Sequence, residues 1–521
     1  MRYFSIILFL LVLAAPFAMR RAVLHENAAW QSSSSDGLRL VVITPHNQDI
    51  RNEFGRAFDA WHRAHYHSPG VIDFRVPGGS NDVKRVLEAS YRANRDASGK
   101  IRADMVPDID VAFGGGDFFF DQELKPLGIL QPIRMDPKLL HEVFPTSTLA
   151  GVKLYDTTVA PDGTPTPQWI GVCLSSFGIV YNPDVYHGLG LPVPSARNGW
   201  HDLTDPRLAG LVALADPAHS GSAAVAYLMV VQRTMADAEA EVFRKFPAIK
   251  SLPKAEMAKN PEYRLAIAAG WKRGMSELVK IAANARYFTD SSPVVPMDVS
   301  RGEAAAGVAI DFYARVTEES VGPDRVEFVA PIGATAITPD PVAVLFGVKG
   351  AKLELARHFM EFSISPEAQR LWILKPGTPG GPIDRSLRRP PVRRDMYADR
   401  TGWADDVNPF EEAAGFNQRG EWMALFSDTR PIWVAAWIDS RDALKEAYEK
   451  ILAVKDDARR AALIDEMADL PIEMGDVEKI KAERRRMEQS PGELDLWRAR
   501  QQIFWAGEFR RHYEEVGKKA N

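Results

Sequence analysis

Cysteine is almost absent from the sequence, because Cys173 is the only one among 521 residues. No intramolecular disulfide can form, so the stability of the fold must come from burial of a hydrophobic core. A lone cysteine can also act as a nucleophile. Cys173 lies within the apolar run WIGVCLSSFGIVYN, however, and this context favours a small buried hydrophobic side chain.

An excess of charge of one sign is missing as well. Lysine and arginine together number 64, against 69 aspartates and glutamates, and the net charge is −5. Domains that bind nucleic acid are usually clearly basic, so we expect no nucleic-acid partner. The hydrophobic fraction of 46% and the charged fraction of 26% are typical of a large soluble globular protein.

Common enzyme signatures are also missing. The sequence contains no G-x-x-x-x-G-K-[ST], no G-x-S-x-G, no H-E-x-x-H and no C-x-x-C. Three histidines, His62, His65 and His67, cluster near the end of a predicted helix, but no cysteine or carboxylate lies nearby to complete a metal site. We therefore interpret them as a solvated face, and we predict no enzyme activity, no cofactor and no resident metal.

The N-terminus contains an uncharged apolar run at residues 4–18, which follows Arg2. Its length of about fifteen residues is typical of a signal peptide, whereas a membrane span needs roughly 20. The serine-rich stretch 31–37 reads as a flexible linker. We therefore predict that residues 1–37 are a signal or anchor segment with a linker. The protein would be exported, and either periplasmic or tethered to the outer face of the inner membrane.

The next part of the chain alternates between strand and helix patterns. Residues 38–44 form a continuous apolar run, residues 71–77 alternate in polarity, and residues 108–117 form a strand that ends in glycines. Between the first two lies a helical pattern with one apolar face: Ile50, Phe54, Ala57, Phe58 and Trp61. This alternation predicts an α/β fold with a mostly parallel sheet.

A second set of similar units follows, and then the character of the chain changes. Further strands are predicted within 168–182, 211–216, 302–316, 325–331 and 340–350, and two helices within 353–372 with a turn at Ser365. Residues 377–394 are rich in glycine, proline and arginine. The remaining chain is charged and helical with spaced tryptophans, which fits a helical cap or a docking surface for a partner.

Three small polar loops stand at predicted helix starts, each after a predicted strand. They contain Gly78, Gly79 and Ser80; Gly115, Gly116 and Asp117; and Ser220, Gly221 and Ser222. A helix N-terminus offers unpaired backbone N–H groups and a partial positive charge, and glycine lets a ligand approach the backbone. If two α/β domains face one another, these loops meet at one cleft. Taken singly, Ser80 or Ser220 could equally be a plain helix cap.

The order of these segments resembles the extracellular solute-binding proteins of ABC importers with the type 2 periplasmic-binding-protein fold. Within them it is most similar to the group that binds ferric iron, thiamine, phosphonates and sugar phosphates. The resemblance covers about residues 38–382. It rests on VVITPHNQDIRNEFGRAFDAW, VPGGSNDVKRVL, DIDVAFGGGDFFF, LSSFGIVYNPDVY, ADPAHSGSAA, VSRGEAAAGVAIDFYA and TPDPVAVLFGVKGAKLELARHFMEFSISPEAQRLW.

The resemblance implies two α/β lobes that close on a ligand like a hinged clamp. Lobe one would comprise residues 38–167 plus 318–382, and lobe two residues 168–317. The chain would cross between the lobes near 168–176 and 312–328. Residues 383–521 exceed the usual family length and would form a mainly helical C-terminal extension that braces lobe one or contacts something else.

The resemblance also implies further site residues. His46 and Asn47 follow the first strand, where family members often contact ligand. Ferric-iron binders carry two adjacent tyrosines after the return strand, and this sequence has Asp311, Phe312 and Tyr313 there. Phenylalanine offers no phenolate oxygen, so the iron interpretation is weakened. Backbone N–H donors favour an anion over a bare cation.

We therefore predict the substrate-binding component of an ABC-type importer, which captures a small anionic solute, phosphorylated solutes included, and delivers it to a membrane permease. The first alternative is a ferric-iron-binding transport protein. The second is a periplasmic enzyme on the same fold, for which only His46, Asp117 and Asp311 could serve as acid or base. The third is a ligand sensor that signals through the C-terminal extension.

Overall fold

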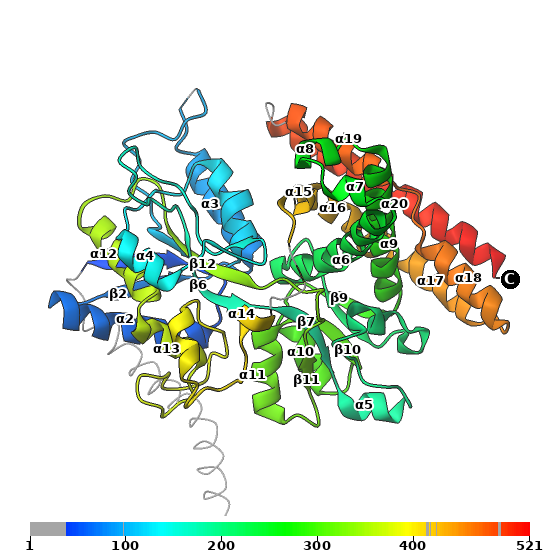
Figure 1. The fold of residues 1–521 in the computed structure, drawn as a ribbon, viewed down its shortest axis with the longest axis horizontal. Coiled ribbons are helices and arrows are strands. Elements are labelled where there is room, and N and C mark those ends of the chain that lie inside the picture. The colour runs from blue at the N-terminus through cyan, green and yellow to red at the C-terminus, as the bar shows by residue number, and fades with distance from the viewer. Residues whose placement is uncertain are drawn as a thin grey trace, which may run out of the picture.

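The structure is a computed structural model that describes residues 38–96, 98–412, 416, 418–423, 425–487 and 491–520. The predicted signal or anchor segment and linker, residues 1–37, lie outside the described residues. Every helix of the described part is too short or too polar to cross a membrane. Two β-sheets, each flanked by helices, lie side by side (Figure 1).

Lobe one is built on a five-stranded sheet with the order β2-β1-β3-β12-β6. These strands are β1 (Arg39–Ile43), β2 (Val71–Arg75), β3 (Val111–Phe113), β6 (Ile170–Ser175) and β12 (Thr338–Val344). The first three are parallel, whereas β12 runs antiparallel to both β3 and β6. A two-stranded hairpin, β4 (Thr148–Leu149) with β5 (Val152–Lys153), lies outside this sheet.

Helices cover the sheet of lobe one and bury its core. They are α2 (Gln48–Tyr66), α3 (Ser80–Arg92), α4 (Pro137–Val143), α12 (Gly350–Ser363) and α13 (Pro366–Ile373). The predicted apolar face of α2 packs inward: Phe54 and Phe58 are fully buried and contact Phe362. Ser365 caps α13 by accepting from the N–H of Ala368, which confirms the predicted turn.

Lobe two has its own five-stranded sheet, with the order β11-β7-β10-β8-β9. The strands are β7 (Phe177–Tyr181), β8 (Val212–Ala215), β9 (Ala285–Thr289), β10 (Ala306–Ile310) and β11 (Glu327–Val329). Its helices are α5 (Pro183–Gly188), α6 (Gly221–Lys245), α7 (Pro247–Lys250), α8 (Lys254–Met257), α9 (Pro261–Ala283), α10 (Val294–Ser300) and α11 (Asp311–Val321). The predicted two-lobed α/β fold is thereby confirmed.

The chain passes between the two sheets at positions that join strands of different lobes. Ser176 alone separates β6 from β7, so the first crossing lies within the predicted range 168–176. The second crossing runs through residues 330–337, between β11 and β12. The sequence placed it at 312–328, but much of that range is helix α11 because the chain turns helical directly after β10.

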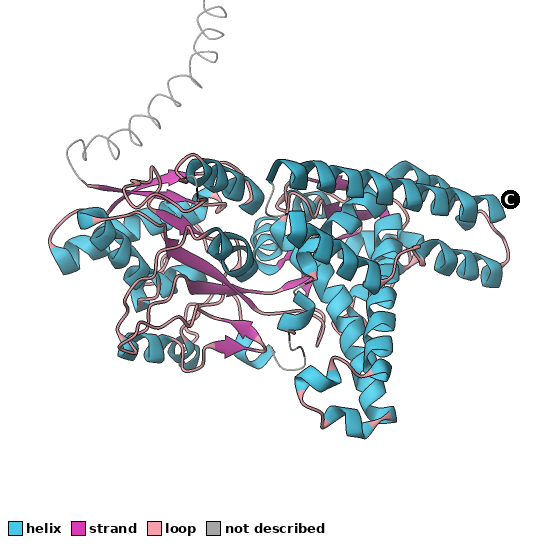
Figure 2. Ribbon diagram, turned by 90° about the horizontal axis from the view of Figure 1, so that it is seen from above, coloured by secondary structure: helices cyan, strands magenta, loops and turns pink. Residues whose placement is uncertain are grey.

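The C-terminal extension packs mainly on lobe two. Its helices are α14 (Pro409–Glu412), α15 (Gly420–Met423), α16 (Phe426–Trp433), α17 (Arg441–Leu452), α18 (Asp457–Ala468), α19 (Met474–Met487) and α20 (Pro491–Lys519). One continuous hydrophobic core contains side chains of lobe two and of the extension, such as Tyr227 with Trp433. Figure 2 shows how strongly helices dominate the side of the molecule that carries the C-terminus.

A third connection between the lobes follows from this packing. Residues 383–407 pack mainly on lobe one, where Leu387 and Val392 join its core, although Arg388 also contacts α11 of lobe two. Phe410 still packs against that core, whereas Phe416 belongs to the core of lobe two and the extension. The extension therefore begins as a wrap around lobe one and ends as a helical layer on lobe two.

Candidate functional site

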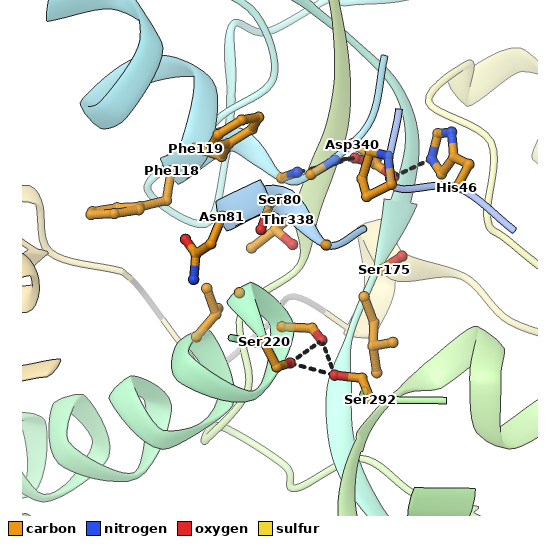
Figure 3. A pocket seen from close by; sticks show the side chains of 18 of the residues that line it. His46, Ser80, Asn81, Phe118, Phe119, Ser175, Ser220, Ser292, Thr338 and Asp340 are labelled. Atoms are coloured by element: carbon orange, nitrogen blue, oxygen red, sulfur yellow. Dashed lines mark hydrogen bonds and ion pairs between the residues drawn. The ribbon is translucent and has the colours of Figure 1, made fainter. Parts of the chain in front are cut away.

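A cavity of about 510 Å³ lies between the lobes, and residues of both lobes line it. All the site residues expected from the sequence line this cavity except Asp311. They are His46, Asn47, Gly78, Gly79, Ser80, Gly115, Gly116, Asp117, Ser220, Gly221, Ser222 and Tyr313. Figure 3 shows the two sides of the cavity, with Ser80 and Asn81 on one and Ser220 and Ser292 on the other.

Three serine hydroxyls meet on the lobe-two side of the cavity. Ser220 and Ser222 stand at the start of α6, and Ser292 follows β9. The Oγ atoms of Ser222 and Ser292 are 3.0 Å apart, those of Ser220 and Ser222 are 3.3 Å apart, and Ser220 also bonds Ser292. Ser220 is in addition the N-cap of α6, since its Oγ accepts from the N–H of Ala223 at 3.1 Å. The cluster therefore sits at the positive end of a 25-residue helix.

The loop of lobe one that begins α3 lies directly against this cluster. A Cβ atom placed on Gly221 would lie 2.7 Å from the Oγ of Ser80, and one on Gly79 would lie 3.2 Å from the backbone oxygen of His219. The side-chain amide of Asn81 donates to the backbone oxygen of Ala218 across the same junction. Two of the three predicted loops thus face one another across the cavity.

Three of the loop glycines have acceptors for their N–H groups within the chain. The N–H of Gly79, the N-cap of α3, donates to Oδ2 of Asp82 three residues later at 3.0 Å. The N–H groups of Gly115 and Gly116 donate to Asp340 Oδ1 at 2.6 and 3.0 Å. Carboxylates of the chain itself already occupy these donors, so they are not available to a bound anion in this structure.

Asp340 is the centre of a buried charged cluster in the cavity wall. Its Oδ2 lies 2.8 Å from His46 Nε2 and also bonds Arg389, whose Nη2 donates to Ser175 Oγ at 2.9 Å. Burial alone would raise the pKa of Asp340, but the Arg389 guanidinium and His46 hold that pKa well below its usual range. Burial lowers the pKa of His46, so the imidazole is neutral at pH 7. To donate to Asp340 it must carry its proton on Nε2.

Asp311 does not line the cavity and has a structural role. Its Oδ2 accepts from the backbone N–H of Ser176 at 3.0 Å and from the Ser176 hydroxyl at 3.3 Å. It thereby fixes the residue at the first crossing to the first turn of α11. Tyr313 does line the cavity, and burial raises the pKa of its phenol to about 12. It stands on helix α11 rather than on a strand.

Two further charged groups of the cavity have few partners. Arg51, on α2, makes no ion pair among the described residues, and its Nε donates to the backbone oxygen of Asn47 at 3.2 Å. Asn47 itself caps α2, because its side-chain oxygen accepts from the N–H of Ile50 at 3.1 Å. Burial raises the pKa of the Asp117 carboxyl to about 7. Half of the Asp117 side chains are therefore neutral near physiological pH.

Several residues of the cavity wall escaped the sequence reasoning. They are Arg51, Phe118, Phe119, Phe177, Ser292, Asp340, Arg389, Phe426 and Arg430. Asp340 carried a signal, because a carboxylate inside the apolar strand run TPDPVAVLF needs a charged or hydrogen-bonding partner. Arg389 carried none, since it lies in an irregular segment and meets Asp340 only through the fold.

Three side chains that could together hold a metal ion lie at the edge of the same cavity. Ligand atoms of Asp216, His219 and Asp290 are all within 4.8 Å of one another. His219 and Asp290 are exposed, and His219 Nε2 lies 4.0 Å from Asp216 Oδ2 as in an ordinary ion pair. His62, which the sequence placed on a solvated face, is instead buried and bonds the backbone oxygen of Ser68 and His358.

Comparison with known proteins identifies the family. A model described as bacterial extracellular solute-binding protein matches residues 106–382, just over half of the chain. The chain belongs to this family. The resemblance to extracellular solute-binding proteins that the sequence indicated is thus confirmed, and the family is one of binding proteins. The match ends before Arg389 and before the whole helical part of the extension.

Individual relatives are distant. A curated protein of Haemophilus influenzae, described as uncharacterized, is 24% identical over 266 residues, which are 51% of this chain and 61% of that protein. The periplasmic binding protein AfuA of Actinobacillus pleuropneumoniae, solved with fructose-6-phosphate, is 20% identical over 64% of this chain and 81% of its own, with a TM-score of 0.45. Iron-bound HitA of Pseudomonas aeruginosa is 16% identical over 75% and 99%, with a TM-score of 0.47.

Proposed function

We propose that the protein is the substrate-binding component of an ABC-type importer and captures a small anionic solute between its lobes. The observation that carries the proposal is the convergence of serine hydroxyls from both lobes on one cavity at the N-terminus of α6. Hydroxyl donors and the positive end of a helix together suit an oxyanion such as a phosphate or carboxylate group.

The charges around the cavity support an anion. Arg51 supplies a guanidinium with no acidic partner among the described residues, so a bound anion would not have to displace a carboxylate from it. The positive charge of Arg389 is largely balanced by Asp340. We therefore assign the anionic group of the solute to the space between Arg51 and the hydroxyl cluster.

The size and lining of the cavity favour an organic solute. A volume of about 510 Å³ falls within the range of about 300–1,000 Å³ typical of small-molecule sites and exceeds what a bare ion requires. Five phenylalanines contribute to the wall: Phe118, Phe119, Phe177, Phe312 and Phe426. Such a wall suits the carbon skeleton of a sugar phosphate or another phosphorylated organic molecule.

Three residues of the cavity wall, Tyr313, Phe312 and Asp340, argue against ferric iron as the ligand. Iron(III) prefers hard anionic oxygens, yet Tyr313 is the one tyrosine among the described residues that line the cavity. The adjacent residue is Phe312, which offers no oxygen ligand. Asp340 is already bonded by Arg389, His46 and two backbone N–H groups, so its oxygens are not free for a metal ion.

The decisive experiment measures binding by the purified full chain to a panel of probes by isothermal titration calorimetry. The panel contains fructose 6-phosphate, inorganic phosphate, citrate and Fe(III). We expect at least one organic anion to bind, and the triple substitution of Ser220, Ser222 and Ser292 by alanine to weaken that binding about 10- to 100-fold or more, because hydrogen bonds to a charged group are lost.

Ser320→Ala is the matched control, since Ser320 is exposed on α11 and, among the described residues, its hydroxyl bonds only the backbone oxygen of Val316. It should bind as the wild type does. Binding of Fe(III) alone would favour the iron alternative, and no binding by any probe would remove the proposal.

Delivery to a permease and export belong to the same proposal. The family is described as extracellular, and residues 1–37 have the pattern of a signal or anchor segment. We infer that the protein works in the periplasm, free or tethered to the outer face of the inner membrane, and hands its solute to an ABC permease complex.

A further inference from the structure

Helix α16 of the C-terminal extension lines the solute cavity. Phe426 and Arg430, both on this helix, belong to the cavity wall together with residues of the two lobes. The helix lies outside the part of the chain that matches the solute-binding family, residues 106–382. The extension thus reaches the cavity that the two lobes form between them.

The same two residues contact lobe one. The ring of Phe426 meets the ring of Phe118 edge-to-face, with centroids 4.6 Å apart and an interplanar angle of 87°. Arg430 Nη2 lies 3.5 Å from Glu123 Oε1, and the other oxygen of Glu123 lies 3.4 Å from Lys84 Nζ. Phe118, although part of lobe one, is a member of the core that lobe two shares with the extension.

On its other side α16 is firmly attached to lobe two. Trp433 packs edge-on against Tyr227 of α6, and its indole N–H points at the sulfur of Met275 on α9 at 3.1 Å. Asp428 is 2% exposed and accepts from Arg484 Nε at 2.6 Å, which ties α16 to α19. The helix therefore moves with lobe two, and its contacts with Phe118 and Glu123 span the cleft.

We propose that α16 is part of the solute site, where Phe426 and Arg430 form one wall of the cavity and hold lobe one close. This inference rests on the proposed function, because the wall matters only if a solute binds there. Glu123 pairs with both Arg430 and Lys84, and Lys84 Nζ also lies 4.0 Å from Glu88 Oε1, so two cations and two carboxylates meet at this end of the cavity.

The extension would then contribute to the choice of solute. The apolar face of Phe426 and the cation of Arg430 select for a solute long enough to reach α16 from the serine cluster. A short anion such as inorganic phosphate would occupy the serine cluster without touching α16. Substitutions on α16 should therefore lower the affinity for fructose 6-phosphate more than the affinity for inorganic phosphate.

The test uses the full chain with Phe426→Leu and Arg430→Gln on α16, and with Phe118→Leu and Glu123→Gln on lobe one. These substitutions keep most of the volume and remove the edge-to-face contact or the ion pair. The controls are Phe504→Leu and Arg459→Gln, because Phe504 is 55% exposed and Arg459 is exposed on α18, away from the cavity.

Two measurements separate this inference from the proposed function. Amide hydrogen exchange of residues 116–127 needs no solute, and we expect it to be about two- to tenfold faster in all four variants and unchanged in the controls. Stopped-flow release of fructose 6-phosphate should accelerate by a similar factor of roughly two to ten.

The outcomes are distinguishable. If no probe binds the wild type while the variants still speed exchange, the proposed function fails but α16 does hold lobe one. If solute binds the wild type and the four variants match the controls in both exchange and release, the inference about α16 is overturned. If Phe426→Leu fails to fold, Phe118→Leu and Glu123→Gln still test the same contact from the side of lobe one.

Discussion

At the scale of single residues, some charged groups of the cavity wall are already paired within the chain and others are not. Asp340 gathers Arg389, His46 and two glycine N–H groups, so it forms a closed unit of the wall. Arg51 and the serine hydroxyls have no such carboxylate partner among the described residues. Groups that still have free bonding capacity therefore indicate the anion site more reliably than the groups that bear the most charge.

We expect Asp117 to make solute binding depend on pH. Burial raises its pKa to about 7, so the side chain is mostly neutral at pH 6 and mostly ionised at pH 8. The ionised form adds a negative charge to the cavity and repels an anionic solute. We expect the affinity of the wild type for fructose 6-phosphate, divided by that of Asp117→Asn, to fall about tenfold between pH 6 and pH 8.

The phosphate group of the solute also titrates in this range, but this changes the affinity of both proteins by the same factor and therefore cancels in the ratio. Calorimetric titrations at pH 6, 7 and 8 provide the measurement. A ratio that stays constant over this range would show that Asp117 does not face the bound anion.

At the scale of elements, the starts of helices α3 and α6 approach each other between the two lobes. The N-cap of α3, Gly79, has ordinary extended backbone angles, so a side chain is sterically allowed by the backbone itself. The space that a side chain would need is taken by the carbonyl of His219 before α6, whose oxygen would lie 3.2 Å from a Cβ atom at Gly79. Glycine is needed here for the contact between lobes and not for the turn.

Gly79→Val should therefore hold the lobes apart. Crowding of this kind costs about 1–3 kcal/mol, so the affinity for fructose 6-phosphate should fall about five- to hundredfold while the unfolding temperature changes little. Gly188→Val is the control, because a Cβ at Gly188 meets no atom within 4 Å. Equal affinities of the two variants would mean that this approach of the loops is not required for binding.

Much at this scale could be predicted from local sequence. The apolar run at 38–44 contains β1, the alternation at 71–77 contains β2, and the serine before Pro366 caps α13. The positions of the loops at helix starts can be predicted from the sequence. The acceptors of their N–H groups, Asp82 and Asp340, cannot, because only the folded structure shows that these carboxylates lie beside the loops. Arg389 could not be predicted, since nothing near it in the sequence reveals that it lies under Phe312 and beside Asp340.

At the scale of the whole molecule, the extension shares a hydrophobic core with lobe two and cannot be regarded as a separate domain. Tyr227 and Met275 of lobe two are buried under Trp433, and Tyr448 of α17 bonds Asn284 at 3.0 Å. Periodicity and spaced tryptophans predicted the helices, but patterns within one segment do not tell which lobe those helices cover.

Deleting residues 407–521 should consequently uncover a large apolar face on α6 and α9. We expect the truncated chain to be insoluble, or to bind a hydrophobic dye and lose its near-ultraviolet circular dichroism, because Trp271, Met275 and Tyr227 are buried in the shared core. Soluble expression, dye fluorescence and circular dichroism provide the readout. A truncated chain that unfolds cooperatively and binds solute as the full chain does would contradict this expectation.

The third connection between the lobes bears on the thermodynamics of capture. A pair of lobes joined by two short strands can separate widely, and a ligand must offset the entropy of that freedom when it closes them. Here the wrap from Leu387 to Phe416 ties the lobes together once more, and Arg388 pairs with Asp405 while donating to the backbone oxygen of Arg315 on α11. Covalent tethering removes conformations from the open ensemble rather than adding contacts to the closed one. The protein thus resembles a preorganised receptor, in which more of the intrinsic binding energy of a solute is expressed as affinity and less is consumed in assembling the site.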